Sequence, residues 1–167
     1  NYKGVQGANW CWGDYHNPGT AGCDCEGFWH GDGIFYPMDW EKPKRLTDIL
    51  DGTSCTLMIG EDVWNKDIAA QGNAQTIYGG GFAWAHPVES TLTCAIPPNT
   101  GIVVPNLGTG DFGNWPERYS FRSRHPGGLQ FAMADGSVHF ILQEIPLATY
   151  RALASINGGE TVNVMSY

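Results

Sequence analysis

The sequence predicts an α+β domain, with an antiparallel sheet and one short helix near the C-terminal end. The chain holds 23 glycines, 10 prolines and 13% aromatic residues in 167 positions. This composition is typical of a loop-rich, β-containing globule and is too aromatic for a disordered chain. Apolar residues alternate on both sides of Asp135-Gly136 and then recur at helical spacing after Pro146. We expect one domain over residues 1–167, because domains cluster near about 100–150 residues.

Residues 128–142 are predicted to form a β-hairpin. Asp135-Gly136 predicts a two-residue type I′ turn, in which both central positions take positive φ. Pairing outward from this turn places six apolar residues on one face, which we expect to be buried. The expected pairs are Met133 with Val138, Phe131 with Phe140, and Leu129 with Leu142.

Two further elements have clear signals. The largely apolar run 56–64 predicts a strand. Pro146 is a favourable first helical residue, and Leu147, Tyr150 and Leu153 follow it at helical spacing, so we expect a short helix that ends at Asn157-Gly158-Gly159. The remaining segments are predicted as loops around short strands over 1–33, a helical turn over 45–50, long connections over 65–82 and 93–116, and a last strand over 161–165.

The net charge of the chain is −8. Nucleic acids and anionic membranes attract cationic surfaces, so we expect neither as a partner. No run of about 18 apolar residues is present, and we expect no membrane-spanning segment within the chain. The sequence opens at Asn1 with neither Met nor a signal sequence, which is typical of a mature product, a processed fragment or an isolated domain.

Five cysteines in a loop-rich chain with few charges indicate an oxidising compartment and disulfides. An odd count leaves one thiol free, or paired with a partner outside the chain. Cys23 and Cys25 are too close together to bridge to each other, and Cys11 is the nearest candidate partner. The disulfide candidates are Cys11, Cys23, Cys25, Cys55 and Cys94.

Two kinds of metal site are alternatives to consider. A zinc cluster fits the ligand types of Cys23, Cys25, His16 and His30, although the usual paired spacings are absent. Calcium is the other alternative, because carboxylates near glycines offer hard oxygen ligands, but no EF-hand order is present. The calcium candidates are Asp24, Glu26 and Asp32, or Asp111 with Asn106 and Asn114. We otherwise expect no cofactor.

Two segments resemble the motifs of a known bacterial family. Residues 125–136 read His-Pro-Gly-Gly-Leu-Gln-Phe-Ala-Met-Ala-Asp-Gly, which is a histidine, nine residues and then Asp-Gly. Residues 51–61 begin Asp-Gly-Thr-Ser-Cys-Thr, where the family usually has Asn in place of Cys55. The chain is thereby similar to the prepilin-like family with a C-terminal H-X9-DG domain, a domain of unknown function abundant in planctomycetes.

The resemblance implies a type IV pilin-like or pseudopilin-like globular head, without the N-terminal hydrophobic helix that would precede Asn1. It implies an extracytoplasmic location, periplasmic or at the cell surface, and a structural role in a surface filament or secretion apparatus. Like or related pilin subunits would be the partners, and the missing helix would provide both subunit and membrane contacts. The motif residues with implied structural roles are His125, Asp135, Gly136, Asp51, Gly52 and Glu61.

His125 and Asp135 invite a catalytic interpretation, but their spacing opposes it. If residues 128–135 are extended, these two residues lie about 20 Å apart and cannot share a proton or a ligand. Asp135 is therefore expected to support the turn, and His125 to shape the segment before the hairpin. Glu61 follows an apolar strand, and we expect it to be buried and paired with Arg122 or Arg124.

No nucleophile has its usual surroundings. Ser54 lacks a G-x-S-x-G elbow, and Cys55 lacks a local partner signature. We therefore expect no enzymatic activity. The alternative function is an extracellular module that binds carbohydrate or another surface ligand, because aromatic rings in loops can stack on sugars. The candidate rings are Trp10, Trp12, Trp29, Trp40 and Trp115.

Overall fold

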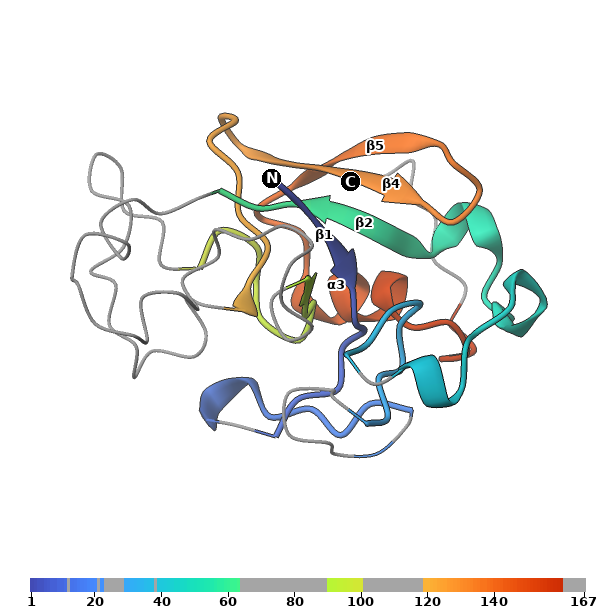
Figure 1. Ribbon diagram of the computed structural model, residues 1–167. Coiled ribbons are helices and arrows are strands. Elements are labelled where there is room, and N and C mark those ends of the chain that lie inside the picture. The colour runs from blue at the N-terminus through green and yellow to red at the C-terminus, as the bar shows by residue number, and fades with distance from the viewer. Residues whose placement is uncertain are drawn as a thin grey trace, which may run out of the picture.

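The computed structural model describes residues 1–11, 13–20, 22, 29–37, 39–63, 90–100 and 119–160. Its centre is a five-stranded mixed sheet with the order β3-β1-β2-β4-β5 (Figure 1). The strands are β1 (Tyr2–Val5), β2 (Leu57–Glu61), β3 (Thr91–Leu92), β4 (Gly128–Met133) and β5 (Val138–Leu142). Short 3-10 helices span Gly13–Tyr15, Asp39–Glu41, Leu46–Asp48 and Thr53–Cys55. The α+β class is therefore confirmed.

The α-helix α3 (Leu147–Ala154) lies close to the position predicted for a short helix. Its Tyr150, Leu153 and Ala154 are buried, which is the face that the helical spacing predicted. Pro146 precedes the helix as its N-cap. The helix ends at Ala154, before the glycines expected to stop it. No helix in the described ranges is long and apolar enough to cross a membrane.

The β4–β5 hairpin forms as predicted, but its turn and register differ from the prediction. Of the two residues expected at the centre of the turn, Asp135 and Gly136, only Gly136 has a left-handed φ, of 87°. The turn is therefore not type I′. The carbonyl of Met133 accepts the N–H of Gly136 at 3.0 Å, and the N–H of Met133 donates to Ser137 at 2.8 Å. These bonds close a three-residue loop of the type I plus bulge kind, one residue longer than expected.

The longer loop shifts the hairpin register by one residue. Phe131 lies opposite His139, and Leu129 lies opposite Ile141. A shift of one residue turns a whole strand over, because side chains alternate between the two faces. The predicted face of β4 is buried, whereas β5 buries Ile141 and exposes the three residues expected inside. Val138, Phe140 and Leu142 are 62%, 40% and 45% exposed.

The hydrophobic core lies between the sheet and α3, around Phe131. The ring centroid of Phe131 is 5.0 Å from that of Phe121 and 6.0 Å from that of Tyr150. Trp10 is also fully buried and packs on Tyr119, with 5.4 Å between ring centroids. Trp10 therefore belongs to the core and not to a sugar-stacking surface.

The N-terminal strand β1 occupies an inner position of the sheet that the sequence did not predict. It pairs antiparallel with β2, placing Tyr2 opposite Glu61, and parallel with β3, placing Gly4 opposite Thr91. The sheet is therefore mixed, not antiparallel throughout. Gly4 leaves room for the Phe35 ring, since a Cβ there would lie 2.9 Å from Phe35 Cδ2.

The predicted last strand over 161–165 lies outside the described residues, as do 65–82 and most of 93–116. The helical turn expected over 45–50 is the 3-10 helix Leu46–Asp48.

Candidate functional site

The two motif segments lie side by side, because β2 and β4 are antiparallel neighbours. Glu61 joins them at one end. Its Oε1 lies 3.2 Å from Nε2 of His125, and its Oε2 accepts the backbone N–H of Gln130 at 2.9 Å. One carboxylate thus fixes both the histidine of the second motif and the strand that follows it.

At the other end, the Asp135 turn packs on the first motif. The N–H of Asp135 donates to the carbonyl of Thr53 at 3.0 Å. Its carboxylate accepts the hydroxyl of Ser137 at 2.7 Å and the N–H of Ser137 at 2.8 Å. These bonds lower the pKa of Asp135, because they stabilise the charged form. His125 precedes β4 and Asp135 follows it, so the strand separates the two residues.

Asp51 ties the first motif to the end of α3. Its Oδ2 accepts the N–H of Gly158 at 2.7 Å and the hydroxyl of Ser155 at 3.1 Å, while its Oδ1 accepts the N–H of Gly159 at 2.9 Å. Gly52 follows with a φ of 95°, in the region that favours glycine. The arrangement holds the chain in place and leaves Asp51 occupied by protein donors.

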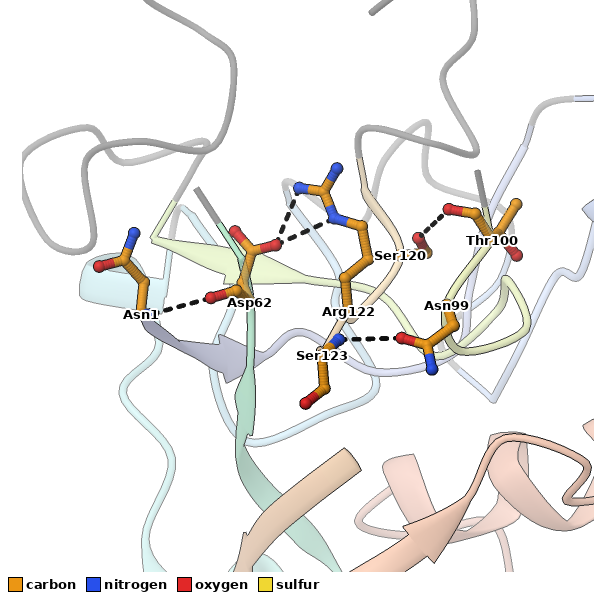
Figure 2. A network of polar contacts seen from close by, with 7 residues as sticks. All are labelled: Asn1, Asp62, Asn99, Thr100, Ser120, Arg122 and Ser123. Atoms are coloured by element: carbon orange, nitrogen blue, oxygen red, sulfur yellow. Dashed lines mark hydrogen bonds and ion pairs between the residues drawn. The ribbon is translucent and has the colours of Figure 1, made fainter. Parts of the chain in front are cut away.

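Arg122 pairs with Asp62, the residue after Glu61. The predicted pairing of Glu61 with an arginine was therefore wrong. Nε and Nη2 of Arg122 lie 3.0 and 2.8 Å from Oδ1 of Asp62, and both side chains are buried (Figure 2). Consecutive residues of a strand point to opposite faces, so Asp62 meets the arginine while Glu61 meets His125. Oδ2 of Asp62 is buried and has no hydrogen-bond partner among the described residues.

Asn99 links the same region to the end of β5. Its φ of 59° is the one left-handed value of a non-glycine residue among the described positions. Its N–H donates to the carbonyl of Phe121, and its Oδ1 accepts the N–H of Ser123, each at 2.9 Å. Its Nδ2 donates to Oε1 of Gln143 at 3.1 Å. Figure 2 shows Asn99 directed toward Ser123, beside the Arg122–Asp62 pair.

Two grooves meet at Ser123, Arg124 and His125. The larger has a volume of about 760 Å³ and is lined by Pro98, Asn99, Ser123, Arg124, His125, Pro126, Gly127, Gln143 and Glu144. The smaller, of about 180 Å³, continues toward Tyr2 and Glu61. His125 was singled out from its motif, but Asn99 and Gln143 carried no sequence signal, because only the fold brings residues 99, 125 and 143 together.

Asp32 does not have the surroundings of a calcium ligand. Its Oδ1 accepts the N–H groups of Ala8 at 2.7 Å and Asn9 at 3.3 Å, and its Oδ2 accepts that of Thr20 at 3.2 Å. Burial raises the pKa of Asp32, although these donors oppose the rise. No group of three His, Cys, Asp or Glu side chains suited to a metal occurs among the described residues.

The other calcium candidates, Asp24, Glu26, Asp111, Asn106 and Asn114, lie outside the described residues. For the zinc alternative, the structure describes His16 and His30 but not Cys23 or Cys25.

Cys55 and Cys94 are free thiols, so their prediction as disulfide candidates was wrong. Cys94 is fully buried in the core, and this burial raises the pKa of its thiol far above the ordinary range. Cys11 is disulfide-bonded, and its partner lies outside the described residues. At least two thiols of the chain therefore remain reduced.

The exposed tryptophan candidates that the structure describes do not line the grooves. Trp29 and Trp40 are exposed, but neither lines a groove beside His125. Trp12 and Trp115 lie outside the described residues.

The fold and the paired motifs define a protein built around the β2–β4 pair, with a polar groove at one end of the sheet. Residues 9–148 match the family model described as "Protein of unknown function (DUF1559)". The chain belongs to this family, whose match includes both motif segments. No curated protein and no solved structure matches the chain.

Proposed function

We propose that the chain is the globular head of a pilin-like structural subunit, which acts outside the cytoplasm in a surface filament or secretion apparatus and catalyses no reaction. The observation that carries the proposal is the exposed apolar row of β5: Val138, Phe140 and Leu142. Contiguous exposed apolar side chains in a folded protein commonly mark a protein interface.

The position of this row supports an assembly role. β5 is one of the two edge strands of the sheet, and no described residue pairs with its outer edge. Hydrogen-bonded pairs alternate along an antiparallel ladder, and Met133–Ser137 and Gly127–Gln143 are bonded positions. The backbone groups of Val138 and Phe140 therefore point outward. Neither Lys nor Pro, which commonly protect edge strands, occurs in β5.

A pair of variants in the full-length protein, expressed in its native cell, tests this role. Phe140→Glu places a charge in the apolar row, and we expect it to abolish assembly while the head still folds. Leu46→Glu is the matched control, because Leu46 is 68% exposed but lies outside the sheet. Electron microscopy of sheared surface material and fractionation of membrane complexes provide the readout. Normal assembly of Phe140→Glu, or equal loss in both variants, would contradict the proposal.

The second candidate is an extracellular module that binds carbohydrate. The groove beside His125 favours it, because amide, carboxylate and guanidinium side chains are among the residues that line a volume suited to a small ligand. Glycan binding by the isolated head, with assembly unaffected by Phe140→Glu, would make this the better description.

A further inference from the structure

We propose that the groove beside His125 binds a carboxylate-bearing sugar, such as a uronic-acid residue of an anionic polysaccharide, with Arg124 as the carboxylate anchor. The inference rests on the binding-module candidate and is independent of the assembly role of β5.

Arg124 is available for a ligand, unlike the cations that the fold uses. Arg122 is paired with Asp62, and Arg151 donates to the carbonyls of Ala95 and Tyr15. Lys44 donates to the carbonyls of Gly31 and Gly33. Arg124 is exposed and makes no hydrogen bond or ion pair with the described residues. A guanidinium binds a carboxylate through two parallel hydrogen bonds, which gives both affinity and orientation.

The neighbours of Arg124 suit sugar hydroxyls. Glu61 lies 3.2 Å from Nε2 of His125, and in the tautomer that carries its proton on Nε2 the ring offers Nδ1 as an acceptor for a sugar hydroxyl. Asn99 and Gln143 are bonded to each other and held by Ser123 and Glu144. Each amide keeps one further N–H for a ligand oxygen. The groove is therefore largely organised before a ligand arrives, which reduces the entropy lost on binding.

The surrounding charge selects for one carboxylate over a more highly charged group. Glu144 lines the groove and Glu61 lies behind His125, so a phosphate dianion would meet two carboxylates near the guanidinium of Arg124. The net charge of −8 also disfavours polyphosphates and nucleic acids. A uronic acid combines a single negative charge with several hydroxyls, and the volume of about 760 Å³ accommodates one or two sugar rings.

Calorimetric titration of the folded chain with oligogalacturonate tests the proposal, with the fully methyl-esterified oligomer as the uncharged comparison. We expect binding of the free acid and at least tenfold weaker binding of the ester. Arg124→Gln should weaken binding of the acid at least tenfold without changing the melting temperature, because the exposed Arg124 side chain makes no hydrogen bond or ion pair with the described residues. The affinity of Arg124→Lys for the acid should lie between those of the parent and Arg124→Gln. Lysine keeps the positive charge but cannot form the two parallel hydrogen bonds of a guanidinium.

Lys42→Gln is the charge-matched control, because Lys42 is exposed and lies outside the groove, and it should bind as the parent does. Equal binding of acid and ester would overturn the recognition of the carboxylate. Equal affinity of Arg124→Gln and Lys42→Gln would overturn the location. Absence of binding to either oligomer would overturn the inference as a whole. Phe140→Glu should bind the acid normally, so failure of the sugar site and failure of the assembly role are separate results.

Discussion

Glu61 and His125 join the two sequence motifs of the chain, with 3.2 Å between Oε1 and Nε2. The same carboxylate accepts the N–H of Gln130, so removal of Glu61 affects two contacts and removal of His125 only one. We expect Glu61→Ala to lower the free energy of unfolding by about 1–2 kcal/mol, because a backbone donor loses its partner. His125→Ala should cost less than about 1 kcal/mol, because the imidazole is half exposed. Urea unfolding measures both, and a larger effect of His125→Ala would contradict this ranking.

The buried pair of Arg122 and Asp62 predicts strong coupling between the two positions. We expect Arg122→Met or Asp62→Leu alone to destabilise the fold by about 3–5 kcal/mol, because each leaves a buried charge without its partner. The double variant should be more stable than the sum of the single effects predicts, since it removes both charges. Chemical unfolding of all four proteins gives the coupling energy. Additive effects would show that the pair does not interact in solution.

Gly136 is expected to be required for its backbone conformation and not for space. A Cβ at this position would meet no atom within 4 Å, but the φ of 87° disfavours other residues. Gly136→Ala should cost about 1–2 kcal/mol, which corresponds to a drop of about 2–4 °C in Tm per kcal/mol for a chain of this size. Gly136→Asn should cost less, because asparagine tolerates left-handed φ. Thermal unfolding measures both, and equal Tm values for alanine and glycine would argue against the bulged turn.

Asp32 and Asp135 should respond to acid in opposite directions. The pKa of Asp135 is lowered in the fold by Ser137, so its contribution is present above the unfolded pKa of about 3.8 and is lost as the pH falls through the folded value. The pKa of Asp32 is raised by burial, so its contribution is complete below about 3.8 and is lost as the pH rises through the folded value.

Asparagine variants separate these two effects. Between neutral pH and pH 3, the stability difference between the parent and Asp135→Asn should shrink, while the difference for Asp32→Asn should grow. Urea titrations at several pH values test both slopes. The same sign for both variants would contradict the assigned environments.

The thiols should divide by accessibility. Ellman's reagent should label the half-buried Cys55 in the native protein and leave Cys94 unreacted, because Cys94 is fully buried and its pKa is raised. Unfolding without reductant should then expose at least these two thiols. This expectation replaces the single free thiol that the odd cysteine count predicted. Fewer than two thiols in the unfolded, unreduced chain would contradict the structure.

Elements with strong local signals were predictable, and elements fixed by distant contacts were not. The strand near 56–64, the hairpin and α3 follow from periodicity and turn residues. The hairpin register could not be predicted, because Asp-Gly suits both a two-residue turn and a three-residue loop with a bulge. Hydrogen bonding of the Met133 carbonyl to Gly136 decides between them. β1 has no periodic pattern, and its place in the sheet depends on residues more than 50 positions away.

The candidate site divides in the same way. His125 and Glu61 stood out because they belong to motifs, and Asp62 was missed because a one-residue difference decides which face of β2 a carboxylate occupies. Asn99 and Gln143 contact each other across 44 positions, and no local pattern could pair them.

The placement of β1 between β2 and β3 affects the order in which the chain can fold. The β4–β5 hairpin and α3 are close in sequence, so their mutual contacts close short loops and form early. β1 can pair only after β2 is made, and its parallel neighbour β3 lies still later in the sequence. The Thr93 hydroxyl, which donates to the Gly7 carbonyl, is 86 residues from it in sequence. β1 is thus made before both of its neighbours in the sheet and is expected to be among the last of the described strands to pair. Until β2 and β3 are made, β1 has neither of its partner strands in the described sheet.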